Sequence, residues 1–393
     1  MAAEPTRPHG DEHEQEHQQD DDRDRDRDPD AADGVPEWYA TGDWSDAASW
    51  HPPPEAAGTG RGRPESLPEE LAYAVVIPTL GRPSLTRTLQ ALAAGHGPLP
   101  RRIVLVDDRP PHDPEPLPVT VPAPLRPLVE IVTGPAAGPA AARNAGWRTV
   151  PERWIAFLDD DVVPSPGWAA DLAADLAAAD PGTAGVQGRI SVPLPPDRRA
   201  TDWERVTAGL ADARWITADM AYRRAALEAV GGFDERFPRA FREDADLALR
   251  VQDTGWTLER GRRRTEHPVR PADWWVSVRA QAGNADDVLM TRIHGRDWWS
   301  RAQAPRGRLP RHLATTAAGA AALLAAALGR RGAAAVCGGL WLAGTADFAA
   351  ARIAPGPRTA DEAARMVTTS VLIPPVAAGH WLAGLLRHRG ESA

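Results

Sequence analysis

Hydrophobic positions from Tyr73 onward alternate between short apolar runs and stretches with helical spacing. Short apolar runs, the kind that forms buried strands, occur at 74–79, 102–108, 128–133, 154–159, 184–192 and 216–224. Helical periodicity is found at 84–94, 139–148 and 167–179, and a further short helix is expected to end at Val230. Strands and helices that alternate in this way predict an α/β fold with a mainly parallel sheet covered by helices.

Three consecutive carboxylates, Asp159, Asp160 and Asp161, end one of the most apolar runs, which is typical of a central strand. Asp159 and Asp161 point to the same side of an extended chain, so both can reach one ligand. Adjacent carboxylates repel one another, and a divalent cation between them removes the repulsion because hard cations prefer oxygen ligands. For this motif taken alone, a solvated acidic turn is an equally good interpretation.

Two further acidic sites follow the same logic. Asp107 and Asp108 end the run at 102–108, and ligands of open α/β sheets bind at the carboxyl edge of the strands. Glu243 and Asp244 open an amphipathic stretch that continues to Val251. An aspartate there can cap the helix or act as a general base in a cleft, and the sequence leaves both interpretations open.

Composition divides the chain into unlike parts. Residues 1–70 hold 20 acidic and 6 basic residues and few aliphatic ones, which predicts a disordered acidic leader. This segment lacks the apolar run of a signal peptide, so we expect the catalytic body to face the cytoplasm. The chain has no lysine and a single cysteine, Cys337, which excludes a lysine nucleophile, a P-loop lysine and a cysteine-based zinc site.

Six motifs, in their order and spacing, resemble family 2 glycosyltransferases of the GT-A fold over about residues 73–265. They are VVIPTLGRP (75–83), IVLVDD (103–108), AARNAGW (141–147), FLDDDVVP (157–164), GGFDERF (231–237) and FREDADLALR (241–250). The resemblance implies a GT-A glycosyltransferase domain at 71–270. One departure is Asp108-Arg109-Pro110, where the family usually has Asp-Gly-Ser, so the geometry of this loop is expected to differ.

The same resemblance implies a site for a nucleotide-diphosphate sugar and a divalent metal, Mn or Mg. The residues it places at the donor nucleotide are Pro78, Thr79, Asp107, Arg143, Asn144, Asp159 and Asp160. The residues it offers to the metal are Asp161, Asp159 and His267. Asp244 matches the catalytic base, with Glu243 beside it. His267 is as readily explained as a structural histidine.

The chemistry of these residues suits a metal-dependent, inverting single displacement. A cation stabilises the charge that develops on the leaving diphosphate, and a carboxylate accepts the proton of the acceptor hydroxyl. A nucleotidyltransferase is one alternative, although VVIPTLGRP lacks the glycine-rich loop usual in that class. A non-catalytic membrane adaptor that keeps only the sugar-nucleotide cleft is another, and the complete set of acidic residues argues against it.

Residues 271–311 combine tryptophan pairs with many arginines, a mixture typical of a membrane interface that faces anionic headgroups. The acidic balance of the whole chain disfavours nucleic acid as a partner. Residues 312–393 are predicted to form an apolar helical region with stretches at Leu313–Gly329, Ala333–Ala351 and Met366–Leu386. These stretches approach the length of a membrane span but are rich in alanine and glycine, so a soluble helical cap stays open beside transmembrane segments. We expect the enzyme at the inner face of the cytoplasmic membrane, with an acceptor that is lipid-linked or delivered at that surface.

Overall fold

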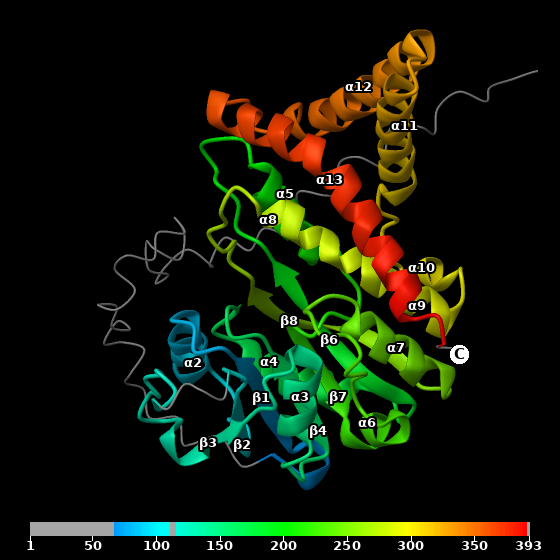
Figure 1. Cartoon of the computed structure of the whole chain (residues 1–393). Coiled ribbons are helices and arrows are strands. Elements are labelled where there is room, and N and C mark those ends of the chain that lie inside the picture. Colours follow the sequence, from blue (N-terminus) through cyan, green and yellow to red (C-terminus); the bar gives the residue numbers. More distant parts are fainter. Residues whose placement is uncertain (1–66, 111–114, 391–393) are drawn as a thin grey trace, which may run out of the picture. The chain divides into compact units, whose positions relative to one another are not determined.

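The computed structural model describes residues 67–110 and 115–390, all within one compact unit of the chain, Thr59–Ala393 (Figure 1). The predicted leader, residues 1–70, falls almost wholly outside the described residues. Eight strands of this described part form one sheet in the order β3-β2-β1-β4-β7-β6-β8-β5. Their bounds are β1 Tyr73–Thr79, β2 Arg102–Asp107, β3 Val129–Thr133, β4 Trp154–Leu158, β5 Val163–Pro164, β6 Thr183–Ser191, β7 Asp219–Arg223 and β8 Thr257–Glu266.

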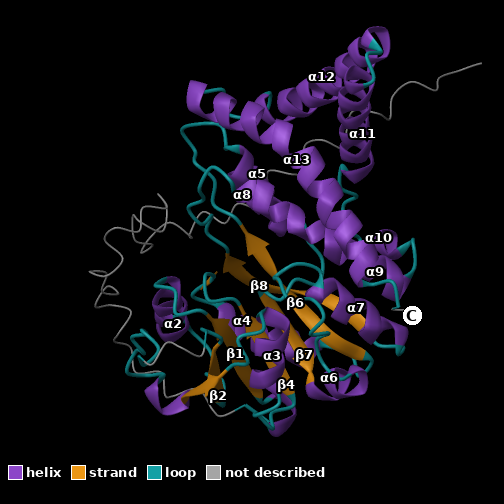
Figure 2. Cartoon of the chain, in the orientation of Figure 1, coloured by secondary structure: helices purple, strands orange, loops and turns teal. Residues whose placement is uncertain are grey.

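Helices cover the sheet and continue into a helical carboxy-terminal region (Figure 2). Those of the sheet domain are α2 Ser84–Ala94, α3 Pro139–Trp147, α4 Trp168–Ala178, α5 Asp202–Ala208, α6 Arg224–Val230 and α7 Glu243–Asp253. Those that follow are α8 Val276–Arg279, α9 Gly283–His294, α10 Trp298–Arg301, α11 Leu309–Ala327, α12 Arg331–Ile353 and α13 Ala360–Arg387. Short 3-10 turns lie at Glu69–Leu71, Arg126–Leu128, Gly209–Ala211 and Ala280–Ala282.

The predicted α/β fold is confirmed, and the sheet is mixed. Strands β3, β2, β1 and β4 run parallel to one another, and β4 is central and buried throughout, as its apolar run predicted. Strand β7 is antiparallel to both β4 and β6, and β5 is antiparallel to β8. The apolar pattern predicts which residues are buried and carries no information on strand direction, so these reversals were not visible in it.

Two apolar layers form the core, one on each face of the sheet. Strand β1 alternates between them: Tyr73 and Val75 pack with α2 and α4, whereas Ala74 and Val76 pack with α3, α6 and α7. This two-residue period is what an extended strand buried on both faces must show.

A buried ion network joins the second half of the sheet. The Arg263 guanidinium donates to the Oδ1 of Asp219 at 2.7 Å and to the Oδ2 of Asp175 at 3.2 Å. Asp219 also accepts hydrogen bonds from Trp168 and Thr265, so strands β7 and β8 and helix α4 share one charged centre. Burial of such charges is tolerable because every charge is paired and hydrogen-bonded.

The arginine- and tryptophan-rich segment folds against the sheet domain. Trp298 is fully buried in a third apolar cluster with Phe237, Leu249 and Met290. The cluster anchors α9 and α10 to α7, so the prediction that this tryptophan faces a membrane is wrong.

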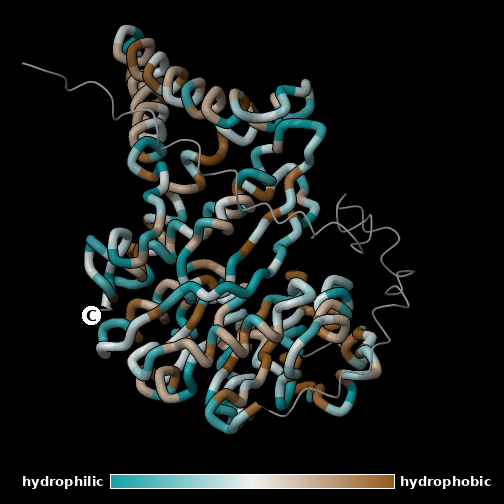
Figure 3. Tube along the Cα trace, turned by 180° about the vertical axis from the view of Figure 1, so that it is seen from behind, coloured by the Kyte–Doolittle hydropathy of each residue, from teal (hydrophilic) through white to brown (hydrophobic). Residues whose placement is uncertain are grey.

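The three apolar stretches form α11, α12 and α13, and Pro374 and Pro375 lie inside the continuous helix α13. Within the described residues, α12 and α13 are long and apolar enough to cross a membrane by length and composition alone. Helix α13 packs closely on α9, because a Cβ added to Gly384 would lie 2.9 Å from the Cα of Ala285. Figure 3 shows apolar positions along α11 and α12.

The buried ion network gives a first prediction. A Cβ at Gly188 would lie 2.2 Å from the Oδ2 of Asp219, so Gly188→Ala must displace this carboxylate from Arg263. We expect the free energy of unfolding to fall by about 3 kcal/mol in denaturant titrations, because the buried charge loses its partner. Gly182→Ala is the matched control, since its Cβ meets nothing within 4 Å. Equal stability of the two variants would show that the network does not hold the sheet.

Candidate active site

The carboxyl ends of β1, β2 and β4 bring the first predicted residues together. Thr79 pairs with Asp107 in the register of β1 and β2, and Pro78, one position earlier, is half-buried. Asp159 begins the loop after β4, beside these ends. The predicted ligand-binding edge is therefore present as a single row of polar residues.

The three aspartates after β4 have different partners. Asp159 accepts a hydrogen bond from the Nη2 of Arg143 at 2.8 Å. Asp160 is buried, and its oxygens accept from the Thr79 hydroxyl at 2.6 Å and from the Arg82 guanidinium at 2.8 Å. Asp160 was predicted to lie at the donor nucleotide. Its carboxylate oxygens instead form these contacts, which tie the loop after β4 to the end of β1.

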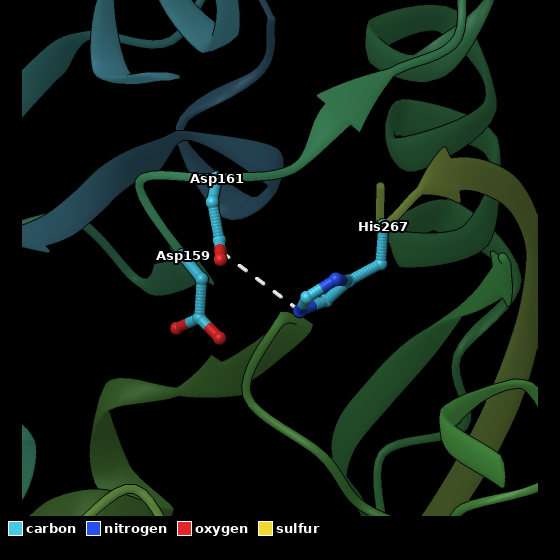
Figure 4. Close-up of side chains that lie close together, drawn as sticks. All are labelled: Asp159, Asp161 and His267. Carbon is cyan, nitrogen blue, oxygen red and sulfur yellow. Dashed lines mark ion pairs between the residues drawn. The ribbon is translucent and has the colours of Figure 1, made fainter. Parts of the chain in front are cut away.

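Asp161 lies next to His267, although 106 positions separate them in the chain. Asp159, Asp161 and His267 each offer one ligand atom, and these atoms lie within 4.8 Å of one another (Figure 4). The Nε2 of His267 is 3.8 Å from the Oδ1 of Asp161. The pairing of β5 with β8, which sets Val163 opposite Glu266, brings the histidine to this place.

The donor set of this group fits a divalent cation. Two carboxylates and an imidazole are ligands that manganese accepts. Burial, with added repulsion from Asp159 and Asp160, raises the pKa of the Asp161 carboxyl, whereas His267 and Arg270 act in the opposite direction. The Nε of Arg270 lies 2.9 Å from the Oδ2 of Asp161, and this arginine side chain is half exposed. A positively charged group thus lies directly beside the Asp161 carboxylate.

Arg143 links this group to the start of α7. Its side chain is 2% exposed, and its Nη1 donates to the Oε1 of Glu243 at 3.0 Å while its Nη2 holds Asp159. Burial opposes the charge of Arg143, but the two carboxylates outweigh it and raise the pKa of the guanidinium. The two acidic motifs are therefore parts of one site.

Glu243 and Asp244 form the first turn of α7. Burial and the neighbouring Asp244 raise the pKa of Glu243 to about 8, against the effect of Arg143. Burial also raises the pKa of Asp244, whose Oδ1 accepts a hydrogen bond from the N–H of Ala245. Arg242, with a φ of 77°, occupies the N-cap position. Asp244 is therefore not the N-cap residue, but it accepts a backbone N–H of the first turn, so its interpretations as a capping residue and as a general base both stay open.

Asn144 has a structural place. Its side chain donates to the Phe233 carbonyl and to Glu235, and accepts from the N–H of Phe233 and the indole of Trp147. Three of these four hydrogen bonds hold the loop after α6, and the fourth joins Asn144 to Trp147 within α3. This loop carries Phe233, whose ring lies 5.6 Å from the Arg143 guanidinium.

The Asp107–Arg109 contact gives the unusual loop after β2 its form. The guanidinium of Arg109 donates to both oxygens of Asp107, at 2.8 and 2.7 Å, and these hydrogen bonds lower the pKa of that carboxyl. Asp108 turns to the backbone N–H groups of Ala136 and Gly138 before α3. The arginine that departs from the family pattern thus directly contacts the carboxylate expected to bind the donor base.

Two arginines of the site were missed in the sequence. Arg82, in the predicted first motif, holds Asp160, and Arg270, three positions after His267, holds Asp161. Both are close in sequence to residues already selected. Their closeness in sequence to the predicted site residues could have marked both arginines as candidates. Nothing in the local pattern indicates which carboxylate an arginine will contact.

Comparison with known proteins shows which proteins the sheet domain is similar to. Residues 74–234 match the family model described as glycosyl transferase family 2. A pre-mycofactocin glycosyltransferase of Mycobacterium tuberculosis is 31% identical over 134 residues, which is 31% of this chain and 28% of that protein. The chain thus spans under a third of the length of this curated relative.

Solved structures with similar folds include a mannosyltransferase of Pyrobaculum calidifontis in complex with GDP-Man and Mn2+. It is 20% identical, with a TM-score of 0.44, over 81% of this chain and 90% of that one. S. aureus TarS is 15% identical, with a TM-score of 0.33, over 56% of this chain and 40% of that one. Glu243, Asp244 and His267 lie beyond the residues matched by the family model. Residues 74–234 of this chain are therefore similar to glycosyl transferase family 2.

Proposed function

We propose that this chain transfers a sugar from a nucleotide-diphosphate donor to an acceptor hydroxyl, with a divalent metal. The observation that carries the proposal is the grouping of Asp159, Asp161 and His267, joined through Arg143 to Glu243. The family match and the name of the curated relative support the same activity.

Asp159, Asp161 and His267 would hold the cation, Mn or Mg. When bound, this ion would neutralise the charge that develops on the departing diphosphate. The nucleoside would lie along the edge formed by Thr79 and Asp107. Thr79 is hydrogen-bonded to Asp160, and Asp107 is hydrogen-bonded to Arg109. Arg143 holds Asp159 in place through an ion pair of 2.8 Å.

Asp244 is the general base of the proposed reaction. The bond from the acceptor oxygen to the anomeric carbon forms as the bond from that carbon to the phosphate oxygen breaks, so the configuration inverts. The hydroxyl proton passes to Asp244. Glu243 is less suited to this role because Arg143 already holds its Oε1. Burial favours the protonated product, because it raises the pKa of Asp244.

We further propose that the carboxy-terminal helices bind the inner face of the cytoplasmic membrane and that the acceptor is lipid-linked. Only 11% of the most apolar window of α12 is buried, against 39% for α13. Large apolar side chains stay exposed along this region, among them Leu323, Leu324 and Leu340. Exposed apolar surface of this extent is typical of a membrane or protein contact.

The metal assignment gives a second prediction. Asp161→Ala should lower metal-dependent donor affinity by about 100-fold, because the remaining ligands hold the cation poorly against water. Titration calorimetry with a panel of nucleotide sugars, with and without Mn or Mg, measures this. Asp180→Ala, which removes an exposed carboxylate outside the site, is the control. Equal donor affinity of wild type and Asp161→Ala at saturating metal would refute the assignment.

The base assignment gives a third prediction. Asp244→Asn keeps the shape of the side chain but loses its basicity, so transfer should fall by about 100-fold or more while donor affinity persists. Steady-state rates and donor binding separate the two effects. Asp253→Asn, at the other end of α7, should leave both unchanged. Near wild-type transfer by Asp244→Asn would mean that the base lies elsewhere.

The membrane proposal gives a fourth prediction. Replacing Leu323, Leu324 and Leu340 together by Gln should weaken partition of the full chain onto anionic vesicles by about 100-fold, because each leucine loses its apolar contact. Vesicle flotation measures this. The matched triple replacement of Ile131, Leu194 and Val206, exposed apolar residues of the sheet domain, should leave partition unchanged. The proposal would be contradicted if the full-length protein stayed soluble without detergent and did not bind vesicles.

A further inference from the structure

Arg242 combines an unusual backbone with an unusual side-chain environment. It lies immediately before Glu243 and Asp244, and its φ of 77° is in the left-handed region that favours glycine. A non-glycine residue there is strained, and such strain persists only where the surroundings fix it.

Three aromatic rings and one carboxylate enclose the Arg242 guanidinium. Its carbon lies 4.3 Å from the centroid of Phe241, 4.9 Å from that of Trp298 and 4.8 Å from that of Trp299. Its Nε donates to the Oδ1 of Asp287 at 2.9 Å. A delocalised guanidinium is the cation best suited to ring faces and a carboxylate together.

The partners of Arg242 are themselves fixed. Trp298 is fully buried and stacks on Trp299 with centroids 3.8 Å apart. The ring of Phe241 rests against Gly283, where an added Cβ would meet it at 2.6 Å. Helix α9, which carries Asp287, is bound to α7 by the hydrogen bond of 2.8 Å between the Nε2 of His294 and the Oδ1 of Asp246.

We propose that Arg242 is a positioning residue for transfer, and that Phe241, Asp287, Trp298 and Trp299 form a clamp that holds it. The clamp fixes the left-handed turn before α7 and so directs the Glu243 and Asp244 carboxylates at the reacting atoms. Arg242 touches no substrate in this scheme. The inference rests on the proposed role of Asp244 and adds what sets its geometry.

The clamp explains why an arginine occupies a position suited to glycine. Turn geometry alone would be satisfied by glycine, which adopts this φ without strain. We therefore infer that the side chain of Arg242, and not its backbone conformation, is the reason for an arginine at this position. Since a displacement of about 1 Å at a reacting group costs on the order of 100-fold in rate, a clamp beside the base has a direct kinetic consequence.

Arg242→Gly tests the proposal, because it keeps the backbone conformation and removes the clamped side chain. We expect kcat to fall by about 10-fold or more, with the donor KM within about twofold and a melting temperature close to that of the wild type. Arg358→Gly is the matched control, since Arg358 has a φ of 59° and its guanidinium donates to the Ala354 carbonyl, away from the candidate site. This control should leave kcat unchanged. Wild-type kcat in Arg242→Gly would overturn the proposal.

Two further measurements separate positioning from general stability. Arg242→Lys keeps the charge but loses the planar fork, so its kcat should lie between those of wild type and Arg242→Gly. Asp202→Asn breaks the buried ion pair with Arg352 and should lower the melting temperature without lowering kcat. If Asp202→Asn, at a similar loss of melting temperature, lowered kcat as much as Arg242→Gly does, the role of Arg242 would be structural only, and the proposal would fail.

Hydrogen exchange gives a readout that does not depend on turnover. The amides of the first turn of α7 should exchange about 10-fold faster in Arg242→Gly than in Arg358→Gly, and unchanged exchange would overturn the clamp. Failure of the proposed function has a different signature. In that case wild-type protein shows no transfer with any donor, or Asp244→Asn retains it, while the exchange comparison still decides the clamp.

Discussion

One buried guanidinium holds the two acidic parts of the site together. Arg143 is the charge that lets Asp159 and Glu243 approach each other inside the protein. Without it, two carboxylates would face one another in a poorly solvated region, at a cost of about 3–5 kcal/mol for the lost partner. The loop after β4 and the first turn of α7 would then separate. Asp159, a proposed metal ligand, and Glu243, the neighbour of the proposed base, keep their spacing because both contact the same side chain.

A second constraint fixes the position of His267 and comes from the half of the sheet formed by β6, β8 and β5. The His267 ring reaches Asp161 only because β8 runs beside β6 and pairs with the short strand β5. The register of β8 is in turn held by Arg263, whose guanidinium is bound by Asp175 and Asp219. The position of His267, a proposed metal ligand, thus depends on a buried network centred on Arg263.

The sequence predicted the strands and helices that end at the candidate site. It predicted far fewer of the side-chain contacts that join these elements. The carboxylates after β2 and β4 could be found because a buried apolar strand ends where its pattern stops. Asn144 illustrates the limit: its motif predicted a place at the donor nucleotide, but three of its four hydrogen bonds are to a loop about 90 positions away. Trp298 illustrates it further, because a tryptophan among arginines has the same local pattern at a membrane surface and in a core. Only the tertiary partners distinguish the two, and no local pattern contains them.

These partners give the carboxy-terminal region a part in the site. Helix α13 packs through Gly384 on Ala285 of α9, and α9 carries Asp287, which holds Arg242 before the proposed base. A continuous chain of packed contacts therefore runs from an apolar helix, a candidate for the membrane, to the first turn of α7. Deleting α13 would expose the face of α9 at Ala285 and Val288, so a truncated chain would confound loss of membrane contact with loss of support for the site. Surface replacements on the intact chain separate the two effects, because they alter the apolar exterior and leave the packing of α9 on α7 in place.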